Sequence, residues 1–224
     1  MKQILSIALG MLLLVACQQE TEEWQEKQTG FLLLSSVKAE VEQVNMNRTR
    51  AVDASFIVEI LREDGSRVVT YQPGELTQQK IQLEVGKYKL KAYTADYNTE
   101  WPNGDKGKAQ YYQVQDFTIV ADKVNKVSMK IPMSNTAISL KLPEGFHEWF
   151  TSYSFSITQG DRTVSLLDGE TAYVNSGTGV SYALSTTNAD DENHNYSNTI
   201  ETPKANMHYE IVYSLATASL QLAD

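Results

Sequence analysis

An aromatic stretch in the first half of the chain has the side chains best suited to binding a small polar ligand. Residues 96–109 form a long polar interruption between two segments of alternating apolar residues. Aromatic residues lie within this interruption and on both sides of it, and the candidate sugar contacts among them are Tyr93, Tyr97, Trp101 and Tyr112. An aromatic ring presents an apolar face to a sugar, and the carboxylates and amides within the stretch could hydrogen-bond its hydroxyl groups. Tyrosines at strand ends more often cover a hydrophobic core, so that alternative stays open.

Residues capable of acid–base or metal chemistry do not form a known catalytic pattern. The sequence has no Gly-x-Ser-x-Gly elbow, phosphate-binding loop or dinucleotide fingerprint. The scattered histidines, which lack the spacing of a zinc site, are His147, His194 and His208. Asp161, Asp168 and Glu170 could be read as a glycosidase pair, but without a fold context for that chemistry they are better explained as turn and surface residues. We therefore predict no enzymatic activity, no cofactor and no metal site.

The only cysteine, Cys17, ends an apolar run that begins after Lys2. Residues 4–16 are too few to cross a bilayer core, which needs roughly 20 residues. A positive charge, a short apolar core and small residues are typical of a signal peptide, which we assign to residues 1–16. The alternative is a buried strand or helix.

The segment Leu14-Val15-Ala16-Cys17 resembles the lipobox of bacterial lipoproteins. This resemblance implies cleavage before Cys17 and acylation of that residue. Two acyl chains would then hold the protein on a membrane without a transmembrane helix.

Residues 17–29 are predicted to form a lipidated, acidic tether. Four glutamates against a single lysine, with no apolar periodicity, indicate a solvated segment. Acidic residues behind an acylated cysteine also resemble the tag that sends some Bacteroides-type lipoproteins to the outer face of the outer membrane. A plain flexible linker is the alternative.

The charge balance excludes one class of partner. The net charge is −9 and there is no basic cluster, so nucleic-acid binding is excluded. With Cys17 lipidated, the fold can contain neither a disulfide nor a cysteine-ligated zinc ion. Its stability must come from an apolar core, which 42% hydrophobic residues can supply.

From residue 30 a two-residue alternation of apolar and polar side chains predicts β-strands. In the first half they are expected at residues 31–41, 56–60, 68–71, 81–85, 87–92, 111–119 and 124–131. Leu83-x-Val85-Gly86-x-Tyr88 resembles the corner of sandwich folds in which a tyrosine hydroxyl bonds to the backbone. We therefore expect the Tyr88 hydroxyl to bond to a main-chain group.

In the second half, strands are expected at residues 138–142, 153–157, 163–167, 172–174, 180–184, 209–213 and 220–222, the last at a sheet edge. Phe146, Trp149 and Phe150 have the spacing of one helical face and predict a short helical plug over the core. Residues 186–199 are predicted to be a polar loop.

Many short strands and almost no helix predict an all-β fold. Each half has about the size of one immunoglobulin-like sandwich. We expect two immunoglobulin-like or fimbrillin-like β-sandwich modules, at residues 30–133 and 134–224, behind the lipoprotein signal peptide. The two halves show no convincing sequence repeat.

Several short motifs together resemble a known family. They are Gly30-Phe31-Leu32-Leu33-Leu34 soon after the lipobox, Thr49-Arg50-Ala51-Val52, Phe56-x-Val58-x-Ile60, Gly86-x-Tyr88-x-Leu90-x-Ala92-Tyr93 and Phe117-x-Ile119-Val120. The pattern resembles a Bacteroides-type lipoprotein family of unknown function and, more loosely, the fimbrillin-like proteins. It covers residues 1 to about 142 best. The family implies an all-β, surface-anchored, non-enzymatic protein.

The fimbrillin likeness implies a processing step. In those proteins an arginine-specific protease can remove an N-terminal strand, and a strand of a neighbouring subunit fills the groove. Arg48 and Arg50 lie in a polar segment after the first predicted strand, where a protease could act. An ordinary loop with two solvated arginines is the alternative.

Two functional hypotheses follow from these observations. The first is a lipid-anchored outer-membrane protein facing the cell exterior, with an adhesive or fimbria-like assembly role and other surface or fimbrial subunits as partners. The second is a glycan-binding lipoprotein for polysaccharide capture. In both, the N-terminal lipid links the chain to the membrane.

Overall fold

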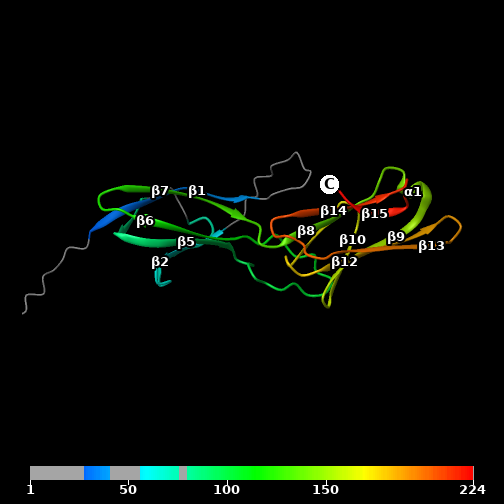
Figure 1. Cartoon of the computed structure of the whole chain (residues 1–224), viewed down its shortest axis with the longest axis horizontal. Helices are drawn as coiled ribbons and strands as arrows, with labels where there is room; N and C mark the ends of the chain where they lie inside the picture. Colours follow the sequence, from blue (N-terminus) through cyan, green and yellow to red (C-terminus); the bar gives the residue numbers. More distant parts are fainter. Residues whose placement is uncertain (1–27, 41–55, 76–79, 224) are drawn as a thin grey trace, which may run out of the picture.

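The computed structural model describes residues 28–40, 56–75 and 80–223. These residues form fifteen β-strands and one short helix. Figure 1 shows an elongated molecule in which two β-sandwiches lie end to end. The predicted all-β fold of two sandwiches is confirmed.

The first sandwich consists of two sheets with the strand orders β4-β1-β7 and β3-β2-β5-β6. Its strands are β1 (Thr29–Glu40), β2 (Phe56–Arg62), β3 (Arg67–Tyr71), β4 (Lys80–Glu84), β5 (Gly86–Thr94), β6 (Tyr112–Ile119) and β7 (Val124–Pro132). All its pairings are antiparallel except that of β1 with β7. Alternate residues, such as Tyr88, Leu90 and Ala92, point into the core, as the alternation in the sequence predicts.

The second sandwich also consists of two sheets, with the orders β11-β8-β14-β15 and β10-β9-β12-β13. Its elements are β8 (Thr136–Lys141), α1 (Phe146–Trp149), β9 (Phe150–Gln159), β10 (Arg162–Leu166), β11 (Thr171–Val174), β12 (Val180–Asn188), β13 (Asn193–Ile200), β14 (His208–Ser214) and β15 (Ser219–Leu222). The last strand lies at the edge of its sheet, which confirms the prediction for the end of the chain.

The two sandwiches share one strand topology. If the strands are counted from one within each sandwich, the sheet orders are 4-1-7 and 3-2-5-6 in both, and β15 is an added eighth strand in the second. In each sandwich the first strand lies between an antiparallel and a parallel neighbour. The molecule is therefore a structural repeat, although no repeat is visible in the sequence.

Two hydrophobic clusters form the cores, and they meet near the start of β8. Ala137 on β8 belongs to the cluster of the first sandwich, while Ile138 and Leu140 belong to that of the second. Tyr173 on β11 also packs against the first cluster. Side chains from both sandwiches thus share the junction, and a boundary between residues 133 and 134 stays a prediction.

The tyrosine corner is confirmed. The Tyr88 hydroxyl donates a hydrogen bond to the main-chain oxygen of Glu84, 2.9 Å away, and the Tyr88 ring stacks on Phe117. Because this residue is only 5% exposed, its hydroxyl needs such a partner to be buried without cost.

The structure corrects two predictions in the second half. Residues 186–199 are not one polar loop: β12 extends to Asn188 and β13 begins at Asn193. Of β13, only Ile200 is fully buried and Tyr196 partly buried, so the apolar alternation that marks a strand is missing. The helical plug is a single turn in which Phe146 is buried but Trp149 is 65% exposed, and Phe150 packs inward from β9.

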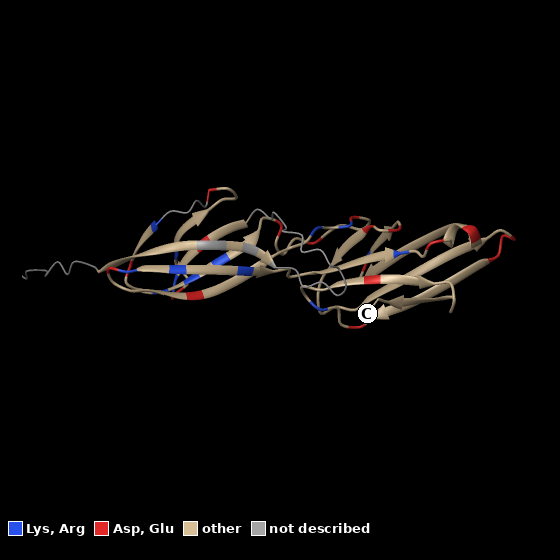
Figure 2. Cartoon of the chain, turned by 90° about the horizontal axis from the view of Figure 1, so that it is seen from above, with Lys and Arg blue, Asp and Glu red and all other residues tan. Residues whose placement is uncertain are grey.

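Charge is distributed unevenly along the molecule. Among residues 134–224 the only Lys and Arg side chains are Lys141, Arg162 and Lys204. Figure 2 accordingly shows most of the Lys and Arg on the first sandwich. The second sandwich is therefore the strongly acidic part of a chain whose net charge is −9.

Candidate functional site

Three of the four predicted sugar contacts lie together on the first sandwich. Tyr93 on β5 pairs in register with Tyr112 on β6. The ring of Tyr97, in the turn after β5, stacks on that of Tyr112 with centroids 4.4 Å apart and an interplanar angle of 14°. The Tyr93 and Tyr97 centroids are 6.4 Å apart. These three partly exposed rings form what we call the tyrosine platform.

A buried glutamine fixes the turn that carries Tyr97. The Nε2 of Gln110 donates to the main-chain oxygens of Asp96, at 2.7 Å, and Thr99, at 2.9 Å. Asn98 lies between them in the left-handed region, with φ of 64°, a conformation that asparagine tolerates better than most residues. The hydrogen bonds from Gln110 therefore fix the turn and, with it, the position of Tyr97.

A cation lies beside the platform. The Lys91 Nζ is 4.6 Å from the centroid of the Tyr93 ring and 3.0 Å from Glu59 Oε2. The other Glu59 oxygen accepts from Arg67 at 2.9 Å, so this nearly buried carboxylate has two cationic partners. Burial alone would lower the pKa of Lys91, but the hydrogen bond and charge of Glu59 raise it. Lys91 is therefore charged at neutral pH.

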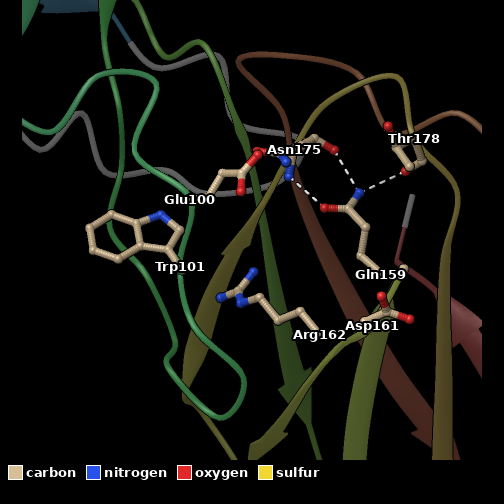
Figure 3. A pocket seen from close by; sticks show the side chains of 8 residues that line it. Glu100, Trp101, Gln159, Asp161, Arg162, Asn175 and Thr178 are labelled. Atoms are coloured by element: carbon tan, nitrogen blue, oxygen red, sulfur yellow. Dashed lines mark hydrogen bonds between the residues drawn. The ribbon is translucent and has the colours of Figure 1, made fainter.

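Trp101, the fourth predicted contact, lines a pocket and is not among the stacked rings of the platform. Its ring packs on Gly107, where an added Cβ would lie 2.8 Å from Trp101 Cδ1 and where φ is 69°, so glycine is needed for two reasons. Trp101 and Glu100 line one side of a pocket of about 320 Å³, and residues of the second sandwich line the other (Figure 3). A joint role of Trp101 and the tyrosines in binding a sugar stays a prediction.

The pocket has a polar lining, and several of its polar groups hydrogen-bond to one another. Gln159 donates to the main-chain oxygens of Asn175 and Thr178, both at 2.8 Å, and accepts from the Asn175 amide. Two buried donors, Trp101 Nε1 and Arg162 Nε, have no hydrogen-bond partner within the described residues. These two donors are almost inaccessible, so a small molecule in the pocket would meet the exposed polar groups of the lining instead.

The loop between β5 and β6 also fastens the first sandwich to the second. Gly104 N donates to Thr163 O at 2.9 Å, and Thr163 N donates to Asn103 Oδ1 at 2.7 Å. Further along, Tyr173 N donates to Lys106 O at 2.7 Å. We call residues 103–106 the loop clamp.

Three charged side chains, Arg162, Lys106 and Glu170, complete the clamp. The Arg162 guanidinium donates to Tyr173 O, at 2.8 Å, and to Asp105 O. Burial lowers the pKa of Arg162, although the Asp105 charge opposes the effect. Lys106 Nζ lies 2.6 Å from Glu170 Oε1, and a hydrogen bond from Leu167 N, followed by that from Lys106, lowers the pKa of the Glu170 carboxyl. The polar stretch therefore has a structural role that sequence reasoning missed, because nothing in the sequence pairs it with residues 60 positions away.

Two of the three candidate catalytic carboxylates have structural partners, and the third, Asp161, lines the pocket beside Trp101. Asp168 Oδ1 accepts from Leu142 N at 2.8 Å, and Glu170 is bound in the clamp. Ser139 Oγ lies 2.9 Å from His208 Nε2, but Ser139 is only 5% exposed and sits in the middle of a sheet. A substrate could not reach this hydroxyl without disturbing the strand.

Some predicted features cannot be placed. Cys17, Arg48 and Arg50 lie outside the described residues. Across the described ranges, no three His, Cys, Asp or Glu side chains come together as metal ligands would. In the same part of the chain there is no helix with the length and apolar character needed to span a membrane.

The chain matches one family model over most of its length. Residues 28–221 match the model of a family described as a domain of unknown function, DUF4493. The chain belongs to this family. The DUF4493 match spans both sandwiches, and it confirms the resemblance to a family of unknown function beyond the residues that first suggested it. None of the curated proteins matches the chain.

Among the similar solved structures are three proteins from species of Bacteroides and Parabacteroides. A candidate cell adhesion protein from Bacteroides uniformis is 14% identical, with a TM-score of 0.48 and coverage of 88% of this chain and 98% of that one. A candidate polysaccharide-binding protein from Bacteroides thetaiotaomicron is 10% identical, with a TM-score of 0.45 and coverage of 83% and 92%. A fimbrial assembly protein from Parabacteroides distasonis is 11% identical, with a TM-score of 0.44 and coverage of 87% and 98%. Identities of this size carry no function from one protein to another.

Proposed function

We propose that this chain is a lipid-anchored, non-enzymatic protein of the outer cell surface that makes adhesive or fimbria-like assembly contacts. The observation that carries the proposal is the position of β1 in the middle of a sheet. The lipobox at Cys17 and the acidic tether behind it support the membrane anchor.

The first strand is both central and built into the core. β1 lies between β4 and β7, antiparallel to one and parallel to the other. Leu32 is fully buried and Leu34 is 5% exposed. A strand in this position supplies main-chain hydrogen bonds on both sides and side chains to the core.

Release of β1 would create a binding groove. The segment that follows it contains Arg48 and Arg50, and a cut there would leave β1 attached to the sandwich by non-covalent contacts alone. Its departure would expose the edges of β4 and β7 and the pockets of Leu32 and Leu34. A strand from another subunit could then bind, with affinity from its backbone and specificity from its alternate side chains.

The test compares processing with assembly on the cell surface. We expect surface protein to begin after Arg48 or Arg50 and to form heat-stable ladders on gels. The double variant Arg48→Gln/Arg50→Gln should instead begin at Cys17 and give no heat-stable ladder. Arg62→Gln, which removes an exposed arginine of the β2–β3 hairpin, is the matched control and should behave as the parent. Parent protein that begins only at acylated Cys17, or ladders that persist in the double variant, would contradict the proposal.

The anchor is tested separately. Labelled palmitate should be incorporated into the parent protein and lost in Cys17→Ser. An unlabelled parent protein would rule out the lipid while leaving the assembly test unaffected.

Glycan binding is the second candidate function, and the tyrosine platform favours it. Three partly exposed rings beside the Lys91 ammonium could stack on a sugar. On this hypothesis Tyr97→Ala abolishes binding on a glycan array. Trp149→Ala, which removes an exposed indole far along the chain, should leave binding unchanged. Equal binding by the parent and Tyr97→Ala would exclude the platform as a site.

A further inference from the structure

The edge strands of the four sheets are protected from unwanted pairing, with one exception. Exposed edges attract further strands, and natural proteins block them with charges, prolines or short strands. Here β11 and β15 have four residues each. Of the longer edges, β7 carries Lys126 and Pro132, β6 Asp116, β3 Arg67, β10 Arg162 and β4 Lys80. Only β13, among the edge strands that the structure describes, is long and has no Lys, Arg, Asp, Glu or proline; its one titratable imidazole, His194, is counted as neutral at pH 7.

β13 is a regular strand with one side open. Its eight residues, Asn193–Ile200, pair with β12 without a register shift. No other described strand pairs with its second edge. The Tyr196 hydroxyl accepts from Tyr213 at 3.1 Å, and the two rings are in edge contact, which fixes the strand on the core. The strand is thus held on the core, and its second edge has no strand partner among the described residues.

The exposed face next to this edge is also uncharged. The outward side chains of β9, β12 and β13 are Ser, Thr, Asn or Ala throughout, among them Ser154, Ser185, Asn195 and Ser197. They hydrogen-bond across strands, as Ser185 Oγ does to Asn195 Oδ1 at 2.6 Å and Thr187 Oγ1 to Asn193 Oδ1 at 2.9 Å. The face lacks the aromatic and apolar residues of a typical sheet-packing interface, so the edge rather than the face is the binding element.

The negative charge of the second sandwich limits which partner can bind along β13. The second sandwich is acidic and contains three Lys and Arg residues in all. Two copies of it repel each other unless they meet along a charge-free surface, and β13 provides one. Its Asn, Ser and Thr side chains offer both donors and acceptors, so the strand is complementary to itself.

We propose that β13 pairs edge to edge, antiparallel, with β13 of a second copy of this chain. The two four-stranded sheets then form one continuous eight-stranded sheet about a two-fold axis. This lateral contact lies in the second sandwich and does not depend on the proposed release of β1 from the first.

The ends of the strand predict an unusual salt dependence. Asp190, Asp191 and Glu192 precede β13, and Glu201 follows it. About a two-fold axis, each residue must face one whose side chain lies on the same side of the sheet, so residues 193–199 pair with Tyr196 at the centre. Asp191 of one copy then comes opposite Glu201 of the other. Salt screens this repulsion, so dimerisation should strengthen between 50 mM and 500 mM NaCl.

The decisive measurement is sedimentation equilibrium of the full chain at both salt concentrations. The parent should form a dimer. Asn195→Lys/Ser197→Lys puts like charges opposite each other across the contact and should weaken it by at least about tenfold. Ser154→Lys, on the same face but on the interior strand β9, is the matched control and should dimerise as the parent does. A parent that stays monomeric up to 100 µM, or a double variant that dimerises equally well, overturns the proposal.

Hydrogen exchange identifies the surface used. The amides of β13 should become more protected as the concentration of the parent rises. Association through the apolar run of residues 4–16 would leave β13 unprotected and the lysine variant unaffected, and it would overturn the proposal. Circular dichroism of the lysine variant checks that it is folded, and protection of β13 in the parent tests the contact even where the variant is unfolded.

Discussion

At the scale of single residues, His208 links the stability of the second sandwich to pH. Burial lowers the pKa of its imidazole, with the Glu210 charge opposing the effect, and Nε2 is hydrogen-bonded to Ser139 Oγ. Below the ordinary pKa of about 6.5 the unfolded chain binds a proton that the folded chain resists. The free energy of unfolding should therefore fall as the pH drops from 7.5 to 5.5, with a contribution of at most about 1.4 kcal/mol per pH unit.

His208→Gln should remove this contribution, whereas His147→Gln, at an exposed imidazole, should retain it. Urea titrations at both pH values measure the difference. Equal pH dependence in the parent and His208→Gln would show that the imidazole is not responsible.

Residues also differ in how far the sequence alone could place them. The Tyr88 bond to Glu84 was predictable because both groups lie within one short motif. Trp101 was predicted as a sugar contact, but its surroundings depend on Gly107 and on Arg162, which comes from the other sandwich. A side chain whose neighbours are set by tertiary contacts cannot be assigned from its local sequence.

At the scale of elements, alternation of apolar residues located most strands because one face of each sheet is buried. β1, predicted at residues 31–41, is observed at Thr29–Glu40. β13 was missed because it lies at an edge and contributes only Tyr196 and Ile200 to the interior. Its partner β12 holds it through side-chain hydrogen bonds, which leave no hydrophobic pattern in the sequence.

The start of β1 offers a test of how tightly the strand is held. A Cβ at Gly30 would collide with the main-chain oxygen of Val120, in a place where the backbone has little room to move. We expect Gly30→Ala to lower the free energy of unfolding by about 1–3 kcal/mol. Gly179→Ala is the matched control, since its Cβ would meet Glu201 O at an ordinary 3.4 Å. Urea denaturation measures both, and equal stabilities of the two variants would show that β1 can shift to make room.

At the scale of the whole molecule, the repeated strand topology could not be predicted because many different sequences are compatible with the same fold. Both sandwiches use the strand orders 4-1-7 and 3-2-5-6, yet each position requires only an apolar residue of suitable size facing inward. Leu32 and Ile138 both lie on the first strand of their sandwich and are both fully buried, with different side chains. Alternation predicts two sandwiches of this size, but it does not specify which strands pair.

The loop clamp predicts that the two sandwiches unfold together. Arg162 joins β10 to the backbone of β11 and of the loop, at Tyr173 O and Asp105 O. Arg162→Met keeps the aliphatic part of the side chain and removes both charged hydrogen bonds, which should cost about 2 kcal/mol in total. Calorimetry should show one transition for the parent and two separated transitions for the variant, since the sandwiches keep their own cores.

Lys204→Met removes an exposed positive charge from the same sandwich without touching the clamp, and should preserve the single transition. A single, unshifted transition in Arg162→Met would mean that the shared junction at Ala137 and Tyr173, rather than the loop, couples the two halves.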